Sequence, residues 1–244
     1  MEKEQKAPKE NSPIKWLIIF FILLQIGLWT QTKEVLPDLA IVPEVASENS
    51  VKAISFGDEQ FYFRVLGFEI QNAGDTFGRA TPLKNYDYNK LSMWFYRLDD
   101  LDSTSNLIPS LASYFYSNTQ RHSDNIYIVR YLVDHAMKDP GKKWWWLSQA
   151  VLIAKYKLKD KQLALDIAKK LAAAPGNLPI WARQMPAFIL ADMGEKEQSY
   201  LILKDIFDNY KNLPESEINF MYYFIQQQLK MLAPEELKEK QTLE

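Results

Sequence analysis

The chain of 244 residues contains no cysteine, only two histidines and only eight glycines. The absence of cysteine excludes disulfides, thiolate metal sites and cysteine catalysis. The scarcity of glycine argues against phosphate-binding loops and against a turn-rich β fold. The net charge is −2 with both signs interspersed, so there is no basic stretch of the kind that binds nucleic acid.

The residues that remain give no catalytic pattern. His122 and His135 are not spaced as a metal-binding pair, and we expect His135 to be a hydrogen-bonded core residue. A calcium loop starting at Asp100 would need Gly in place of Ser105 and Glu in place of Leu111. There is no Gly-x-Ser-x-Gly nucleophile elbow. We therefore predict no catalytic, cofactor-binding or metal-binding residues and no small-molecule substrate; an unrecognised helical enzyme is the least favoured alternative.

An uncharged, apolar run near the amino terminus predicts a transmembrane helix over residues 16–33. No charge occurs between Lys15 and Lys33, and a helix of that length spans roughly 25 Å, near the lower limit for crossing a bilayer. Trp16 and Trp29 bracket the run, as interfacial aromatic anchors do. The lipid bilayer is thus the first predicted partner.

Two other interpretations of this run are open. A cleaved signal peptide has a similar apolar core but needs a small-x-small site after it, and a buried core helix is rarely apolar on every face. The uncleaved anchor is favoured. Lysines gather in the polar tail, residues 1–15, so the positive-inside rule predicts a cytoplasmic amino terminus. The rest of the chain would then lie outside the cytoplasm, in the periplasm if the protein is bacterial.

The remaining chain divides into a linker, a helical body and a tail. Residues 34–57 contain two prolines and a polar run, which predict a linker. Helical periodicity then predicts a body over residues 58–232. A short charged tail, residues 233–244, ends the chain.

Within the body, one helix-turn-helix pattern recurs. Residues 144–210 contain two copies offset by about 35 residues, and self-similarity at this period indicates a helical solenoid. The second helices align with Asp160 on Glu195, Ala164 on Ser199, Ile167 on Ile202, Ala168 on Leu203 and Leu171 on Ile206. A more divergent third copy begins at Ile108, with an offset of about 36 residues.

The repeat resembles the tetratricopeptide repeat over residues 108–210. The resemblance rests on Ala164, Ala168, Leu171 and Pro175 in the second helix and on Leu147, Val151 and Ala154 in the first. The glycine usual in that family is replaced by Val151 and, in the next unit, by Pro186. The resemblance implies an all-α superhelix of stacked helix pairs, joined here to one transmembrane helix.

In that family the first helices line a concave groove that takes a peptide or a partner helix. The register of the resemblance places six residues toward the groove: Ala112, Tyr116, Trp145, Ser148, Lys155 and Arg183. The triplet Trp144–Trp146 sweeps about 200° around a helix, which is wider than an apolar stripe. At least one of the three should therefore be exposed or touch a neighbour; the alternative is that all three are buried between repeats.

These observations predict a binding protein. The first hypothesis is a membrane-anchored scaffold or adaptor that docks on, or is a subunit of, a membrane or envelope complex. The alternative is a periplasmic chaperone-like assembly factor. Both predict protein partners and no nucleic acid.

Overall fold

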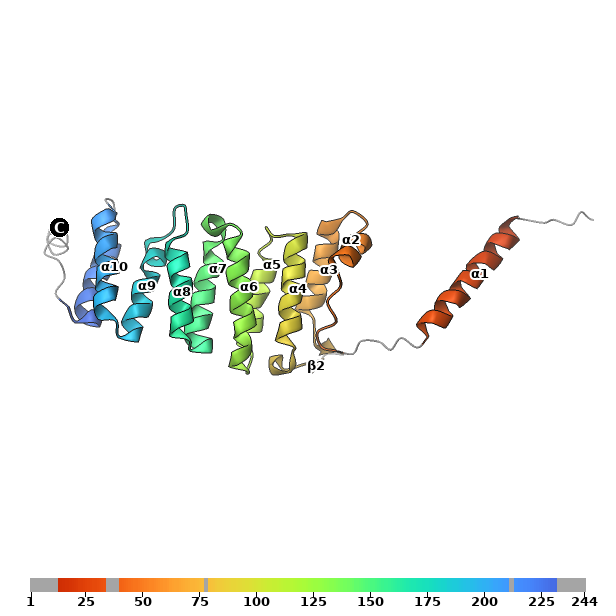
Figure 1. Cartoon of the computed structure of the whole chain (residues 1–244), viewed down its shortest axis with the longest axis horizontal. Helices are drawn as coiled ribbons and strands as arrows, with labels where there is room; N and C mark the ends of the chain where they lie inside the picture. Colours follow the sequence, from red (N-terminus) through yellow and green to blue (C-terminus); the bar gives the residue numbers. More distant parts are fainter. Residues whose placement is uncertain (1–12, 34–39, 77–78, 211–212, 232–244) are drawn as a thin grey trace, which may run out of the picture. The chain divides into compact units, whose positions relative to one another are not determined.

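The computed structural model describes residues 13–33, 40–76, 79–210 and 213–231 (Figure 1). The chain divides into two compact units, residues 1–40 and 41–244. The described residues contain one antiparallel pair of two-residue strands, β1 (Asp75–Thr76) and β2 (Arg79–Ala80). Every other regular element among them is helical, which confirms the predicted all-α class.

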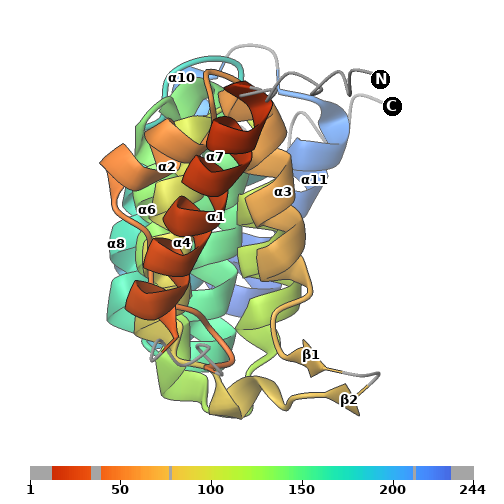
Figure 2. The same ribbon diagram turned by 90° about the vertical axis from the view of Figure 1, so that its right-hand side faces the viewer.

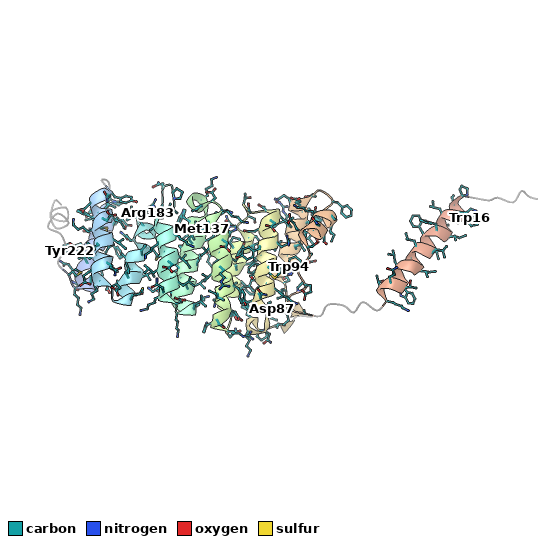
Figure 3. The ribbon with its side chains drawn as sticks, viewed as in Figure 1. Trp16, Asp87, Trp94, Met137, Arg183 and Tyr222 are labelled. Atoms are coloured by element: carbon teal, nitrogen blue, oxygen red, sulfur yellow. The ribbon has the colours of Figure 1, made fainter. Side chains whose placement is uncertain are left out.

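The first unit contains α1 (Pro13–Thr32), a helix of 20 residues with a mean hydropathy of 1.7 that is long and apolar enough to cross a membrane. Twenty residues rise about 30 Å, the thickness of a hydrocarbon core. None of its side chains is buried. Trp16 lies near its start (Figure 3), and the Lys33 ammonium lies 5.9 Å from the centroid of the Trp29 ring near its end. Residues 1–12 of the predicted amino-terminal tail and the predicted tail 233–244 lie outside the described residues.

The second unit is built from ten α-helices in its described part. They are α2 (Glu48–Ile54), α3 (Glu59–Gln71), α4 (Tyr88–Leu101), α5 (Leu107–Ser110), α6 (Asn125–Met137), α7 (Pro140–Leu152), α8 (Lys161–Ala172), α9 (Ile180–Met193), α10 (Lys196–Asn209) and α11 (Glu215–Tyr223). Three of them, α5, α7 and α11, continue into π-helical turns, η2 (Leu111–Phe115), η5 (Ile153–Leu158) and η6 (Phe224–Leu229). Single 3₁₀ turns occupy Leu83–Asn85, Tyr116–Asn118 and His122–Asp124.

These helices form two layers. From α6 to α10 each helix packs chiefly on the next one in sequence. Alternate helices also touch, since Tyr96 on α4 meets Tyr131 on α6 edge to face and Trp145 on α7 meets Trp181 on α9 in the same way. We call α3, α5, α7, α9 and α11 the first layer and α4, α6, α8 and α10 the second. Figure 2 shows α4, α6 and α8 on one side and α3 and α11 on the other.

An acidic residue stands at the amino-terminal cap of every second-layer helix. The caps are Asp87, Asp124, Asp160 and Glu195, spaced by 37, 36 and 35 residues. A carboxylate stabilises this end of a helix because it faces unpaired N–H groups and the positive end of the dipole. The Asp87 and Asp160 side chains each accept a backbone hydrogen bond there, at 3.0 and 2.9 Å.

The residues four, eight and eleven positions after each cap are all buried. They are Leu91, Ile128, Ala164 and Ser199; Phe95, Leu132, Ala168 and Leu203; and Leu98, His135, Leu171 and Ile206. This spacing puts three side chains on one helix face. These aligned positions are thus equivalent in burial, although Ile202, aligned with the buried Ile167, is half-buried. The helix that starts after Asp87 shows the same cap and buried positions upstream of residues 108–210, on a side where the sequence predicted a degenerate unit.

The boundary predicted between linker and body is too late. Val42 and Val51 are buried in the core of the second unit, which begins at residue 41. The indole of Trp94 (labelled in Figure 3) donates a hydrogen bond to the Pro43 carbonyl at 3.0 Å. The prolines interrupt helical periodicity, and this is why the sequence predicted a linker. An extended segment can still bury apolar side chains, and helical periodicity gives no information about that burial.

Gly74 lies close to the side chain of Tyr86, and substitution can test this contact. Its φ is +75°, and a Cβ there would lie 2.7 Å from Tyr86 Cζ, whose hydroxyl donates to the Ala73 carbonyl. Gly194 caps α9 with φ +90° and has no atom within 4 Å of such a Cβ. We expect Gly194→Ala to cost about 1 kcal/mol through backbone strain, and Gly74→Ala to cost about 1–3 kcal/mol more through overpacking. Urea unfolding of both variants measures the difference; equal losses would contradict the close approach of Gly74 to the Tyr86 ring.

Candidate partner-binding surface

The exposed aromatic side chains on the described helices of the second unit all lie on the first layer. They are Phe61, Phe68, Tyr114, Phe115, Trp145, Tyr156, Phe220 and Tyr223. The second-layer helices expose large apolar residues only singly, at Met93, Met137 and Leu201. Scattered apolar residues are normal on a surface, whereas a contiguous set is typical of an interaction site.

The set follows the repeat. Tyr114, Leu152, Phe188 and Tyr223 are spaced by 38, 36 and 35 residues, close to the spacing of the second-layer caps. Phe188 is half-buried and the other three are exposed. Each of four successive first-layer segments thus presents a large apolar side chain at the equivalent place, which a solvated surface does not require.

Side-chain contacts join these segments into one row. The Trp145 indole donates to the Tyr114 hydroxyl at 2.8 Å, from α7 to η2. The Trp145 and Trp181 rings lie 6.4 Å apart between α7 and α9, and the Phe188 and Phe220 rings 5.7 Å apart between α9 and α11. We define the aromatic face as the first-layer surface made by Tyr114, Phe115, Trp145, Leu152, Tyr156, Trp181, Phe188, Phe220 and Tyr223.

The tryptophan triplet divides as its helical sweep predicts. Trp146 is buried, Trp144 is half-buried against Trp181 at 5.6 Å between centroids, and Trp145 is 41% exposed. The prediction that at least one of the three reaches the surface is confirmed. Trp145 combines a large apolar area with an indole N–H, the kind of side chain that dominates protein interfaces.

Cations next to the aromatic face have partners within the fold. Lys155 forms an ion pair with Asp192 of α9, and its ammonium lies 4.7 Å from the Tyr156 ring. Burial by itself lowers the pKa of Lys155, but its hydrogen bonds and ion pairing with Asp192 and Tyr156 outweigh this and raise it. Lys157 donates to the Ser117 carbonyl at 3.0 Å, and burial lowers its pKa. The charges at this edge therefore serve the contact between helices.

Three residues predicted to face a groove lie in the core instead. Ala112, Tyr116 and Ser148 are buried; the Tyr116 hydroxyl donates to the Ile70 carbonyl and the Ser148 hydroxyl to the Trp145 carbonyl at 2.7 Å. The resemblance gave a register that points them outward. Two positions along a helix correspond to about 200°, so a small error in register exchanges Tyr116 for the exposed Tyr114.

Arg183, also predicted for the groove, closes the end of α8. Its guanidinium donates to the Ala172 carbonyl and, at 3.1 Å, to the Gly176 carbonyl. Carbonyls in the last turn of a helix have no partner within the helix. Arg183 therefore links α9 to the preceding turn, and of the predicted groove residues only Trp145 presents much of its side chain on the aromatic face, beside the paired Lys155.

We expect Arg183→Met to lower the free energy of unfolding by about 1.5–3 kcal/mol, the range for hydrogen bonds to a charged group. Arg183→Lys should recover little, because an ammonium cannot reproduce the two-pronged geometry. Thermal unfolding followed by circular dichroism measures both variants. If Arg183→Met instead abolished partner binding without changing stability, Arg183 would contribute to the binding surface, as the sequence predicted.

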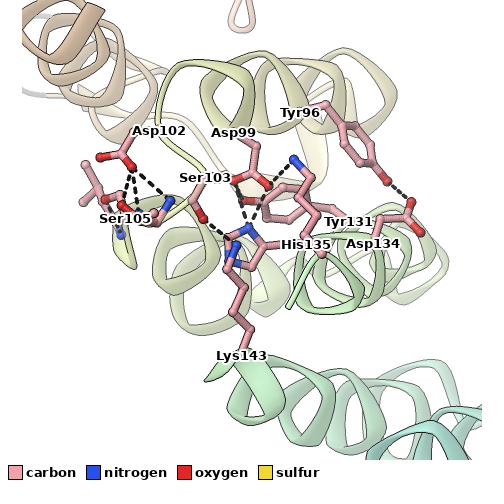
Figure 4. A network of polar contacts seen from close by, with 12 residues as sticks. Tyr96, Asp99, Asp102, Ser103, Ser105, Tyr131, Asp134, His135 and Lys143 are labelled. Carbon is pink, nitrogen blue, oxygen red and sulfur yellow. Dashed lines mark hydrogen bonds and ion pairs between the residues drawn. The ribbon is translucent and has the colours of Figure 1, made fainter. Parts of the chain in front are cut away.

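A buried polar network joins α4 to α6 (Figure 4). Asp99 accepts from Tyr131 at 3.0 Å and contacts His135 Nδ1 at 2.7 Å and the Lys138 ammonium at 3.3 Å. Burial and the neighbouring Asp99 raise the pKa of Tyr131 well above its ordinary value, so its hydroxyl stays a donor. Both oxygens of the Asp99 carboxylate are thus directed at partners in the neighbouring helix.

An Asp–His pair can orient a general base, but this one is sealed. His135 is only 1% exposed, so a substrate cannot reach its ring in this conformation. The expectation of a hydrogen-bonded core histidine is confirmed. His135 takes the buried position that Leu171 and Ile206 occupy in the next units, and it needs Asp99 because a buried ring nitrogen without a partner is costly.

We expect Asp99→Ala to cost about 3–5 kcal/mol, the range for removing one partner of a buried pair. Asp100→Ala is the matched control, since Asp100 is exposed and its ion pair with Arg97 at 3.2 Å should contribute under about 1 kcal/mol. Urea unfolding compares the two. Similar losses from both variants would show that the network adds nothing to the contact between α4 and α6.

Comparison with protein-family models finds no matching family, and comparisons with curated proteins and with solved structures find no match. Function therefore has to be argued from the chain's own geometry. Among the described residues, no group of three or more His, Cys, Asp or Glu side chains is placed to hold a metal ion.

Proposed function

We propose that the protein is a membrane-anchored helical-repeat scaffold that binds a protein partner through the aromatic face. It would dock on, or be a subunit of, a membrane or envelope complex. The observation that carries this proposal is the exposed apolar side chain that recurs at the repeat spacing in three first-layer segments, at Tyr114, Leu152 and Tyr223, with the half-buried Phe188 at the corresponding spacing in a fourth. Burial in the fold does not explain these side chains, whereas binding a partner does.

Two further observations support a repeat scaffold of the tetratricopeptide kind. The second-layer caps recur every 35–37 residues, with buried positions at matching offsets. A stack of such units offers an extended surface made of equivalent helices, which suits a long, linear partner segment. In this proposal α1 crosses the membrane with the amino terminus in the cytoplasm and the repeats outside it, in the periplasm of a bacterium.

The chemistry of the face favours an apolar, weakly charged partner, and we propose an amphipathic helix. Trp145, Tyr156 and Tyr223 offer large ring surfaces with polar atoms at their edges, while the nearby Lys155 is already paired with Asp192. A charged partner would have to displace that pair, whereas an apolar helix face can lie across the rings. Binding should therefore depend little on salt.

A chaperone-like assembly factor is the second candidate. It is favoured by the same row of rings, which extends over four segments and could accept apolar stretches of different sequence. The two candidates differ in the number of partners. A scaffold should hold one, and a chaperone should hold many in turn.

Photo-crosslinking in the full-length, membrane-bound protein separates these possibilities. A benzophenone amino acid replaces Tyr223 or Leu152 on the aromatic face, and Leu201 on α10, which is exposed on the second layer, as the matched control. We expect one discrete protein adduct from positions 223 and 152 and none from 201. Many adducts would favour the chaperone, and adducts of equal yield from 201 would contradict the proposed surface.

Trp145→Ala should lower the yield of that adduct at least tenfold, the effect expected for removing a buried interface tryptophan. Met137→Ala, at an exposed second-layer position, is the control and should leave the yield unchanged. Trp145 also contacts Tyr114 and Trp181, so Trp145→Ala should lower stability somewhat, and thermal unfolding must show that both variants remain folded at the temperature of crosslinking. An unchanged yield with Trp145→Ala would remove the tryptophan from the interface.

A further inference from the structure

The turn between α2 and α3 exposes apolar side chains that the aromatic face does not include. Phe56 is 94% exposed and Ile54 is 52% exposed, and Phe61 is exposed in the first turn of α3. We call these three residues the hydrophobic tip. Nothing in the described part of the second unit buries Phe56, although phenylalanine is among the side chains that gain most from leaving water.

The backbone of the tip is strained in a way that keeps Phe56 outside. Phe56 has φ +49° and Gly57 has φ +88°. Glycine adopts the left-handed region freely, but a bulky side chain there is a conformational outlier. The turn is fixed on both sides, because Ser55 donates to the Lys52 carbonyl at 2.8 Å and Asp58 accepts from the Phe61 amide at 2.8 Å. An outlier held in this way is a reason to look for a function.

We propose that the hydrophobic tip inserts into the interfacial layer of the bilayer that α1 crosses. This inference rests on the membrane anchorage proposed above. Only residues 33–47 separate α1 from α2, and even when fully extended they span no more than about 50 Å. The tether keeps the tip at a high local concentration near the membrane surface, and apolar side chains such as phenylalanine can bury at the boundary between headgroups and acyl chains.

The charges around the tip specify the kind of lipid. Asp58 and Glu59 lie between Phe56 and Phe61, and the cation nearest in sequence, Lys52, is paired with Glu48 at 2.6 Å. The tip therefore brings acidic rather than basic groups to the membrane. Anionic headgroups would repel them, so the ligand is a zwitterionic surface such as phosphatidylcholine, contacted through apolar side chains.

The test uses the absence of cysteine in the chain. Ile54→Cys carries a single environment-sensitive fluorophore in the full-length protein reconstituted in phosphatidylcholine vesicles, and Leu201→Cys is the matched control at another exposed position. We expect nitroxide-labelled lipids to quench the label at 54 at least threefold more than the label at 201. Anionic lipid should reduce that difference.

Phe56→Gly then removes the side chain without harming the turn, since glycine accepts this φ. It should abolish the difference between positions 54 and 201 while thermal stability is retained, and Phe56→Trp should restore it. Failure of the full-length protein to float with vesicles would overturn the anchorage and the tip together. If the protein floats with the vesicles but the label at 54 is quenched by aqueous iodide as strongly as the label at 201, the tip alone is overturned.

Discussion

The burial of three side chains on each second-layer helix is the constraint on which the second unit depends. Each helix begins at an acidic cap and turns the residues four, eight and eleven positions later inward, so that Leu98, His135, Leu171 and Ile206 occupy equivalent places. A single helix pair cannot cover such a face alone, and it becomes stable only against its neighbours. The alternation of the two layers is consistent with that requirement.

The array tolerates different chemistry at one position when the neighbouring helix supplies a partner. His135 replaces an apolar residue, and Asp99 of α4 with Tyr131 of α6 satisfies it. Arg183 similarly supplies donors for carbonyls at the end of α8. Polar residues in this fold thus act between adjacent units. Asp99 and His135 are a residue pair of the kind found in active sites, but both are buried from solvent here, and they join α4 to α6.

In the second layer the repeat spacing places residues in the core, whereas in the first layer a similar spacing also places large apolar residues at the surface. Its inward residues pack on the second layer, and its outward ones present Tyr114, Leu152 and Tyr223 to solvent at the repeat spacing. Keeping such side chains in water lowers solubility and adds nothing to the core. The hydrophobic tip adds a strained, exposed Phe56 near the start of the same unit. Packing within the described residues of the second unit explains neither feature.

The sequence by itself determined what depends on local period and composition. The apolar run predicted a helix over residues 16–33, observed as Pro13–Thr32, and the offset of about 35 residues identified equivalent buried positions such as Ala164 and Ser199. Helical period and apolar character are local properties, so they can be recognised from the sequence without the tertiary structure. The sweep of the tryptophan triplet likewise predicted that at least one ring would be exposed or touch a neighbour, and Trp145 is exposed.

Only the tertiary structure decided which face of each helix meets which neighbour. Tyr116 is buried against α3, where its hydroxyl donates to the Ile70 carbonyl, whereas Tyr114 is exposed, and an offset of one or two residues changes the side. Arg183 donates to the last carbonyl of α8 and to the Gly176 carbonyl in the following loop, and Val42 is buried within a segment whose sequence predicts a linker. These outcomes depend on contacts between residues distant in sequence, and such contacts leave no periodic signal in a single chain.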